Sequence, residues 1–362
     1  MEFYIPTKVL FEDNVVQTHK SEFKKYGRKA LLVTGRESAH KSGVLNDLLP
    51  LLENENLGYH IFDEVTENPD LSVIRRGKEC LLEQGCDFVI GIGGGSPLDA
   101  GKAISVMGAN NLSEKELYEV TLHKNHFPIL AIPTTSGTGS EITQYSVITN
   151  RETSIKAGFG SEKCFPKVSF LDPKYTLSLN ARVTRDTAID ALSHLLEGLY
   201  SNKYNEFLLP FIHTGVKLIY DNLSLCLKDL SCIKYRHNLM LAANYGGIVI
   251  AHTSTTLQHS IGYPLTTVFG VSHGLANGLV MRQIMNLYEP HIKDRTDRLF
   301  VKLNITKDAF FKWLDSFEMV FEGKIDEVFL KNRVPEVLKS RNMTLSPCVV
   351  NEQEITNIYK TL

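Results

Sequence analysis

The sequence lacks most features that mark membrane, nucleic-acid-binding or disulfide-rich proteins. No uninterrupted apolar run reaches the ~18 residues that a membrane span needs, and the N-terminus shows no signal-peptide pattern. The net charge is −2, with both signs interspersed, so no basic surface for a nucleic acid is predicted. The six cysteines form no CxxC pair, which argues against a zinc ribbon or dithiol motif. We therefore expect a cytoplasmic protein without a membrane or nucleic-acid partner.

The first half of the chain alternates short apolar runs with segments of helical spacing. Helical spacing appears at 42–56 and 70–85, and residues 2–13 read as an extra strand or hairpin. This alternation predicts a parallel sheet covered by helices on both faces. The apolar runs that we interpret as buried strands cover residues 29–35, 59–65, 87–95, 127–135 and 168–173.

After residue 173 the pattern becomes helical. A chain of 362 residues is long enough for two domains, and the change of pattern places the boundary near 174–182. We predict an α/β domain at 1–178 with a Rossmann-like parallel sheet, and an all-α domain at 179–362, with the ligand site between them. The predicted helices cover residues 184–200, 205–221, 234–251, 274–290 and 307–322.

A glycine-rich turn, GIGGGSPLDAGKA at 91–103, follows the third predicted strand. Glycines let the backbone approach a phosphate closely, and the N-terminus of the next helix offers free N–H groups and a positive dipole. The spacing is not GxGxxG, so a tight turn without a ligand is an equal alternative. The residues that would contact the phosphate are Gly93, Gly94, Gly95 and Ser96.

Two further strand ends suit a dinucleotide. The loop AIPTTSGTGSEIT at 131–143 carries Thr134, Thr135 and Thr138, whose hydroxyls suit contacts to phosphate, ribose or the nicotinamide amide, although a polar loop that caps a helix is the alternative. The first strand is followed by Gly35, Arg36 and Ser38. An NAD site usually has a carboxylate here, whereas a nearby arginine accommodates the 2′-phosphate of NADP. Arg36 therefore favours NADP, and Glu37 turned inward is the alternative.

One aspartate and three histidines form a candidate metal set. Asp190 and His194 are four residues apart, so on a helix they face a common point. His259 and His273 lie in a segment with glycines and a proline, which we interpret as two helices joined by a loop. Such ligands suit Fe²⁺ or Zn²⁺. Taken alone, the first pair could be a solvated surface pair, and either later histidine could be a core residue.

These stretches together resemble the iron-containing (group III) alcohol dehydrogenase family. The matching stretches are GIGGGSPLDAGKA, IPTTSGTGSEIT, DTAIDALSHLLEG and LQHSIGYPLTTVFGVSHGLANGLVM, in the family's order. The resemblance implies a dinucleotide-binding domain, a helical domain and a metal between them. It assigns the metal to Asp190, His194, His259 and His273. It assigns the pyrophosphate to Gly94, Gly95 and Ser96 with Asp99 nearby, the nicotinamide side to Thr134, Thr135 and Thr138, and the cofactor ribose to Lys156.

Two positions depart from the family pattern. Many members carry a histidine four residues after the third ligand, often assigned to proton transfer, and this chain has Tyr263 there. The frequent carboxylate after the first strand is Gly35, which again favours NADP(H) over NAD(H). Tyr263 would either donate its hydroxyl or wall the pocket, and we name His273 and Tyr263 as candidate catalytic residues.

The predicted reaction is hydride transfer between a nicotinamide cofactor and a small alcohol or aldehyde held by Fe²⁺, with Zn²⁺ as the second choice. The predicted enzyme is a homodimer or a higher homo-oligomer. A dehydroquinate-synthase-like lyase is one alternative, but those relatives use a glutamate where this chain has Asp190. A non-catalytic protein that binds metal and nucleotide is the other.

Overall fold

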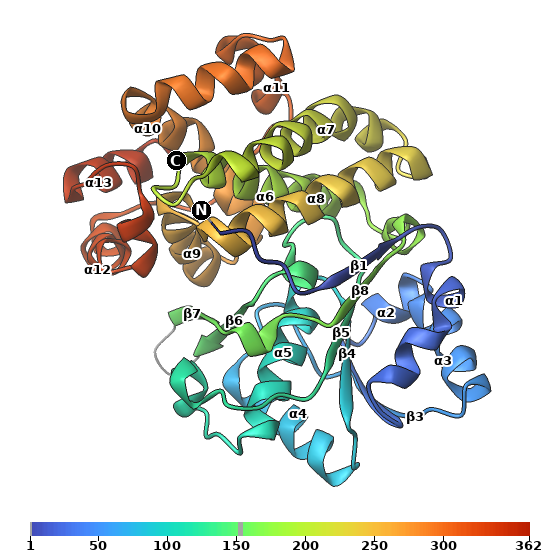
Figure 1. Ribbon diagram of the computed structural model, residues 1–362. Coiled ribbons are helices and arrows are strands. Elements are labelled where there is room, and N and C mark those ends of the chain that lie inside the picture. The colour runs from blue at the N-terminus through green and yellow to red at the C-terminus, as the bar shows by residue number, and fades with distance from the viewer. Residues whose placement is uncertain (1, 151–154) are drawn as a thin grey trace.

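The N-terminal part of the chain folds around a six-stranded parallel sheet (Figure 1). The computed structural model describes residues 2–150 and 155–362. The strand order is β1-β8-β5-β4-β2-β3, and every neighbouring pair runs parallel. The strands are β1 (Lys8–Phe11), β2 (Lys29–Thr34), β3 (Gly58–Phe62), β4 (Phe88–Gly93), β5 (Ile129–Pro133) and β8 (Val168–Leu171).

Helices cover both faces of this sheet, which confirms the prediction from the alternating pattern. One face packs on α4 (Leu71–Glu83) and α5 (Gly95–Ala109). The opposite face packs on α1 (Val15–Thr18), α2 (Ser38–Lys41) and α3 (Val44–Asn54). Both faces of the central strands are therefore buried, and this is why β2, β4 and β5 appear in the sequence as nearly continuous apolar runs.

Residues 2–13 contribute the single edge strand β1, which is the first of the two predicted alternatives, a strand or a hairpin. A separate antiparallel hairpin, β6 (Tyr145–Asn150) and β7 (Ile155–Gly160), was not predicted. Its strands mix polar residues such as Ser146 and Thr149 with apolar ones, so no apolar run marks them.

The second part of the chain is a helical bundle around its own apolar core. The predicted helix at 274–290 continues to Leu303 through a kink, with Pro290 inside it and a non-helical φ of −135° at Ile292. The predicted helix at 307–322 ends earlier, at Asp315. The helices are α6 (Ala181–Tyr200), α7 (Leu209–Lys228), α8 (Ile233–Thr253), α9 (Leu257–Phe269), α10 (His273–Leu303), α11 (Lys307–Asp315), α12 (Glu327–Leu338) and α13 (Glu352–Lys360).

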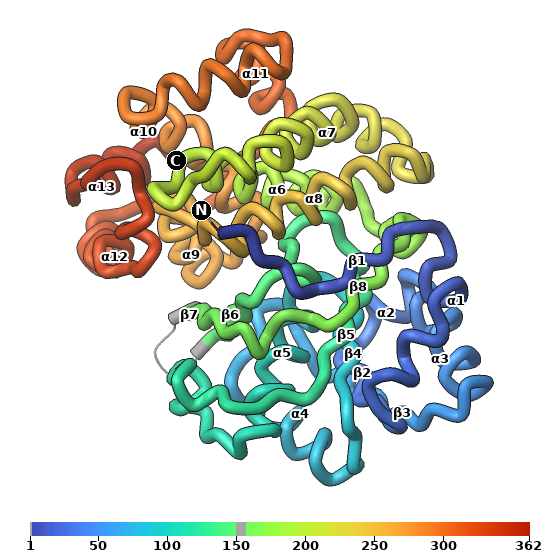
Figure 2. The backbone as a smooth tube through the Cα atoms, in the orientation of Figure 1, coloured from blue at the N-terminus to red at the C-terminus, as the bar shows by residue number. Residues whose placement is uncertain are grey.

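The loop after β5 packs against helices α6 and α8 of the second part of the chain. A Cβ on Gly137 would lie 2.8 Å from the Cβ of Thr187 in α6. Gly139 has a φ of +63°, and a Cβ there would lie 2.5 Å from the Cα of Gly247 in α8. Glycine is therefore required at both positions, because any side chain would push the loop away from the helices. Figure 2 shows the backbone passing from the sheet to the helical part.

Among the described residues, no helix combines the length and apolar character that crossing a membrane would require.

Candidate active site

Helix α6 carries the first two candidate ligands into the centre of the helical part. Its N-terminus is capped by Asn180, whose side-chain oxygen accepts a hydrogen bond from the backbone N–H of Val183. Asp190 and His194 then project from one face, and both side chains are buried. The polar face of α6 is thus not the solvated surface that the spacing alone also allowed.

The other two candidate ligands come from the segment that we interpreted as two helices and a loop. His259 lies in the first turn of α9, and His273 is the first residue of α10. The Oδ1 atom of Asp190 lies 3.8 Å from Nε2 of His259 and 3.6 Å from Nε2 of His273. One ligand atom from each of these three residues falls within 4.8 Å of the other two.

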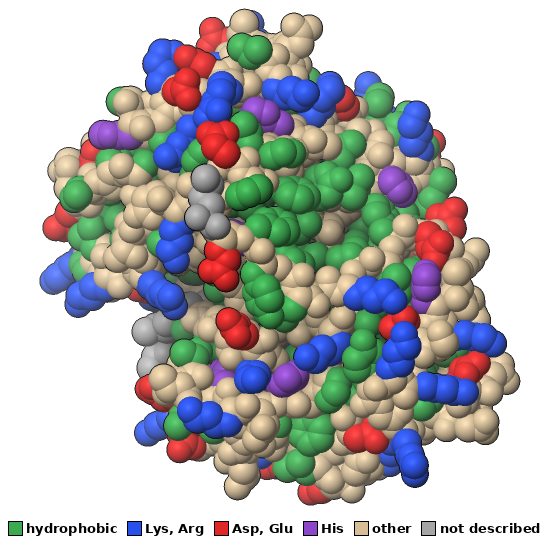
Figure 3. All heavy atoms as spheres, viewed as in Figure 1, with side chains coloured by type: hydrophobic (Ala, Val, Ile, Leu, Met, Phe, Trp, Pro, Cys, Tyr) green, Lys and Arg blue, Asp and Glu red, His purple; other side chains and the backbone are tan. Residues whose placement is uncertain are grey.

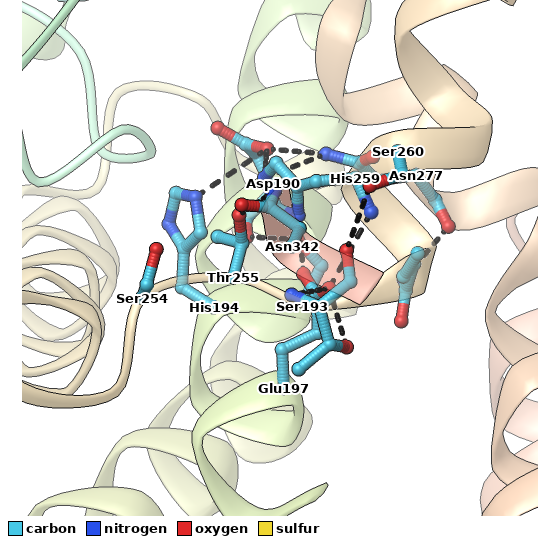
Figure 4. A network of polar contacts seen from close by, with 12 residues as sticks. Asp190, Ser193, His194, Glu197, Ser254, Thr255, His259, Ser260, Asn277 and Asn342 are labelled. Carbon is cyan, nitrogen blue, oxygen red and sulfur yellow. Dashed lines mark hydrogen bonds and ion pairs between the residues drawn. The ribbon is translucent and has the colours of Figure 1, made fainter. Parts of the chain in front are cut away.

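His194, on the same helix as Asp190, lies beside this group but is not one of the three residues whose ligand atoms all lie within 4.8 Å of one another. Its Nε2 atom lies 4.0 Å from Oδ1 of Asp190, and its ring lies 5.0 Å from that of His259 between centroids. Zn²⁺ binds nitrogen and oxygen ligands at about 2.0–2.2 Å, so two ligand atoms on one ion lie up to roughly 4.4 Å apart. The Asp190 distances fit a single ion, and Figure 4 shows His194, His259 and Asn277 turned toward Asp190.

The electrostatics favour an ionised Asp190 and a neutral His194. Burial acts to raise the pKa of Asp190, but the charges of His194, His273 and His259 and the hydrogen bond from Asn277 outweigh it and lower the pKa to about 2. Burial also lowers the pKa of His194, more than Asp190 raises it. A carboxylate with unprotonated imidazoles is the form that binds a divalent metal.

Glu197 orients His259 from the side away from the other ligands. Its Oε2 atom pairs with Nδ1 of His259, and its Oε1 atom accepts the backbone N–H of Thr256 at 2.6 Å and the Thr256 hydroxyl at 2.8 Å. The carboxylate is fully buried. With the proton on Nδ1, the Nε2 lone pair of His259 points to the candidate metal position.

Sequence reasoning did not assign this role to Glu197, nor any role to Asn277. Glu197 follows His194 by three residues, and Asn277 follows His273 by four. A search for polar residues one helical turn from each ligand would have found both, because such residues share a helix face.

Tyr263 lies beside the ligands, as its spacing from His259 predicts. Its ring stacks on that of His273, with centroids 5.7 Å apart and an interplanar angle of 11°. It meets the ring of His259 edge-on at 6.2 Å. Burial, followed by the negative charges of Glu197, Asp190 and Asp99, raises the pKa of the phenol above its ordinary value. The phenol therefore stays protonated and is a poor proton acceptor.

The glycine-rich turn forms the start of α5 and packs against the loop after β5. Gly93 has a φ of +142°, and its carbonyl accepts the N–H of Thr134 at 2.9 Å. A Cβ on Gly95 would lie 2.7 Å from Cγ2 of Thr138. Ser96 accepts the N–H of Asn68 at 3.2 Å. The predicted pyrophosphate and nicotinamide residues thus form two adjoining loops next to α6.

Asp99 lies in the same turn, but its described contacts hold the two loops together. Its carboxylate accepts the hydroxyl of Ser140 at 2.5 Å and the N–H of Val147 at 2.9 Å. Lys102, fully buried one turn later, donates to Ser140 at 2.7 Å and to the carbonyl of Tyr145 at 2.7 Å. Burial lowers the pKa of Lys102. This network fixes the glycine-rich turn against the β6–β7 hairpin.

The end of β2 presents no carboxylate at position 35. A Cβ on Gly35 would lie 3.1 Å from the carbonyl oxygen of Val65 and 3.3 Å from Oγ of Ser38. Arg36 and Glu37 are exposed, and the carboxylate of Glu37 pairs with Lys41. Lys156 belongs to β7, but its side chain lies outside the described residues.

Comparisons with known proteins cover the whole of this architecture. Residues 6–173 match the family described as iron-containing alcohol dehydrogenase, and residues 184–362 match the C-terminal region of the Fe-containing alcohol dehydrogenase family. The fold resembles that of an iron-containing alcohol dehydrogenase from Thermotoga maritima, at 35% identity and a TM-score of 0.94, covering 99% of this chain and 98% of that one.

Two curated relatives illustrate the range of substrates and cofactors named for similar proteins. The chain is 30% identical over 289 residues to a 1,3-propanediol dehydrogenase from Citrobacter freundii, covering 78% of this chain and 74% of the relative. It is 24% identical to an NADPH-dependent butanol dehydrogenase from Clostridium saccharobutylicum, covering 99% and 89%.

Proposed function

The chain belongs to the iron-containing alcohol dehydrogenase family, and from this premise we propose that it transfers hydride between NADP(H) and a small alcohol or aldehyde. Membership makes it an oxidoreductase of the alcohol dehydrogenase type. The observation that carries the finer proposal is the convergence of Asp190, His259 and His273 within 4.8 Å, next to the loop that carries Thr134 and Thr138.

The donor set suits the metal that the family name implies. An Fe²⁺ or Zn²⁺ ion bound there would act as a Lewis acid toward the oxygen of an alcohol or carbonyl. Asp190 supplies the single negative charge, Glu197 fixes the tautomer of His259, and Gly137 brings the loop against α6 one turn before Asp190. These residues supply position and electrostatics, whereas the cofactor supplies the redox chemistry.

An activity assay with a ligand variant tests this function. We expect wild-type enzyme loaded with Fe²⁺ to oxidise NADPH with short aldehydes, and His259→Ala to lose metal and turnover together. His291→Ala, an exposed histidine on α10, is the matched control and should behave as wild type. A His259→Ala variant that holds metal and turns over normally would refute the assignment. Turnover without net NADPH oxidation would favour the lyase. If the protein shows no turnover of any kind, a non-catalytic protein that binds metal and nucleotide would be favoured.

The cofactor preference rests on Gly35 and Arg36. Curated relatives include NADH- and NADPH-dependent enzymes, so the family does not decide it. Gly35 removes the carboxylate that would repel a 2′-phosphate, and the exposed Arg36 can pair with one. Hydrogen bonds to charged groups are worth roughly 1.5–3 kcal/mol, which corresponds to about tenfold to a hundredfold in specificity.

A pair of substitutions at position 35 tests this preference. Gly35→Asp should shift the ratio of kcat/KM toward NAD(H), because it restores the repelling carboxylate. Gly35→Ala is its control, since it adds only the Cβ that approaches the Val65 carbonyl at 3.1 Å. A wild type that prefers NAD(H), or an equal shift in both variants, would contradict the electrostatic argument.

We also propose a division into domains at 178/179 and a cytoplasmic location.

The third proposal is a homodimer or higher homo-oligomer. β1 is an edge strand that could pair with another chain, and Phe3 and Tyr4 before it are 44% and 50% exposed. Phe3 stacks on Phe211 of α7, and Figure 3 shows hydrophobic side chains gathered around α7 and α8. Light scattering of the eluting protein tests the state, and a monomer at micromolar concentration would exclude an oligomer.

A further inference from the structure

The amide nitrogen of Asn277 lies among the atoms that would face a metal ion. Nδ2 donates to Oδ1 of Asp190 at 2.9 Å, and it lies 3.1 Å from Nε2 of His259 and 3.4 Å from Nε2 of His273. These are the same three atoms whose mutual distances define the candidate metal site. One N–H₂ group therefore touches all three corners of the ligand triangle.

Several contacts fix Asn277 in this position. The side chain is fully buried, and it follows His273 by one turn of α10. Its backbone carbonyl accepts the side-chain N–H of Gln258 at 2.8 Å. A Cβ on Gly262 would lie 2.5 Å from Oδ1 of Asn277, so a glycine at 262 leaves room for the amide. The carboxylate of Asp190 sets its orientation, because a flipped amide would bring two oxygen acceptors together.

Asn277 differs in this respect from Glu197. Glu197 bonds the Nδ1 atom of His259, which points away from the other ligands, so its bond and a metal bond can exist together. Asn277 instead places its N–H₂ group, whose two hydrogens three neighbours share, against Nε2 of His259 and His273, and the lone pairs on these atoms are the ones that an ion would need. An N–H group and a metal ion cannot use the same lone pair at once.

We propose that Asn277 is a place-holder for the metal ion. In the metal-free protein its amide holds Asp190, His259 and His273 in the binding arrangement, and on metal binding these hydrogen bonds are exchanged for metal–ligand bonds. Asn277 is thus a positioning residue that holds the ligand side chains together before an ion binds. This inference rests on the proposed metal-dependent function, and it deepens that function by naming how the site is loaded.

The proposal fixes the direction in which a substitution changes metal affinity. Asn277→Leu has a similar size and no N–H, so the metal-free form loses all three contacts. The loaded form loses at most the bond to Asp190, because the histidine lone pairs already belong to the ion. The metal-free form is therefore destabilised more, and by linkage the variant binds metal more tightly. We expect about a tenfold tighter Kd, the equivalent of ~1.4 kcal/mol.

Co²⁺ is a suitable probe, because it binds a given nitrogen and oxygen site more strongly than Fe²⁺ and has a visible spectrum. Its Kd is measured by chelator competition at fixed pH, and Tm is measured for metal-free and loaded protein. Asn277→Leu should bind Co²⁺ more tightly and should lower the Tm of the metal-free form more than that of the loaded form. Asn222→Leu, a buried asparagine on α7, is the control and should change both Tm values equally and leave the Kd unchanged.

The outcomes separate this proposal from the metal site itself. A wild type that binds no Co²⁺ at one ion per chain would refute the proposed function. A wild type that binds Co²⁺, with an Asn277→Leu variant of equal or weaker affinity, would overturn the place-holder alone. If Asn277→Leu does not fold, Asn277→Ala decides by the same comparison, because it also removes the amide while adding no bulk.

Discussion

Replacing Glu197 with glutamine should weaken metal binding by about 10–100-fold and leave the fold in place. Glutamine has nearly the same shape, but one of its two terminal atoms is an amide nitrogen. If that nitrogen faces His259, Nδ1 must become the acceptor and the ring proton moves to Nε2, which can no longer bind a metal. If it faces Thr256 instead, it meets the backbone N–H now bonded at 2.6 Å, and two donors oppose each other. Either orientation costs binding energy.

The size of this effect follows from the burial of the pair. Glu197 and His259 are 0% and 2% exposed, so water cannot replace the lost contact. A tenfold to hundredfold loss of affinity corresponds to about 1.4–2.7 kcal/mol. Glu141→Gln is the matched control, because Glu141 is also buried but accepts a hydrogen bond from Asn244 at 3.2 Å instead of contacting His259. Burial raises the pKa of Glu141, so a neutral amide suits its site.

The assay is Co²⁺ or Zn²⁺ affinity by chelator competition, with turnover measured separately at saturating metal. Glu197→Gln should bind the metal with a Kd that is about 10–100-fold higher than that of wild type. Most of its turnover should return when metal saturates the site. Glu141→Gln should retain wild-type affinity. An affinity within threefold of wild type for Glu197→Gln would refute the tautomer argument. An equal loss in both variants would show that burial of any glutamate, rather than contact with His259, is what matters.

Three further results are expected. Tyr263→Phe should keep most of kcat and shift KM modestly, because the phenol pKa is raised by burial; a fall beyond about a hundredfold, near 2.7 kcal/mol, would show direct proton transfer. Chelation of the metal should abolish turnover but preserve cooperative unfolding, since the helical core is apolar; its loss would contradict a purely catalytic metal. Burial, then Lys167 and Lys163, lower the pKa of His126 to about 4, below its unfolded value of ~6.5. The stability that the neutral His126 contributes is thus fully present above pH ~6.5 and is lost as the pH falls toward 4. His126→Gln should therefore flatten the dependence of the free energy of unfolding on pH in this range.

The fold was predictable where burial leaves a clear pattern in the sequence. The strands β2, β4 and β5 are covered on both faces, and two-sided burial requires an apolar run that can be recognised without a structure. The hairpin β6–β7 was not predicted, because polar residues interrupt its strands. The full length of α10 was not predicted, because Pro290 suggests that the helix ends there, whereas the helix bends and continues to Leu303.

The candidate ligands could be named from the sequence because chemistry limits which residues can hold a metal and helical spacing limits where they stand. Asp190, His194 and the Tyr263 position all follow from an i, i+4 rule on one helix. The meeting of α6 with the starts of α9 and α10 does not follow from such a rule. It depends on close packing, for example at Gly274, where a Cβ would lie 1.8 Å from the carbonyl of Asp186. Family resemblance supplied that long-range information here.

The residues that hold the ligands illustrate where sequence reasoning ends. Glu197 and Asn277 each stand one helical turn from a ligand on their own helix, yet Glu197 contacts His259 of α9 and Asn277 contacts Asp190 of α6. Spacing could have named both as candidates, but not the atom that each one reaches. That atom decides the sign of the effect, because a bond to Nδ1 strengthens metal binding and a bond to Nε2 competes with it. The two residues should therefore change metal affinity in opposite directions when their polar groups are replaced, a contrast that only the three-dimensional arrangement predicts.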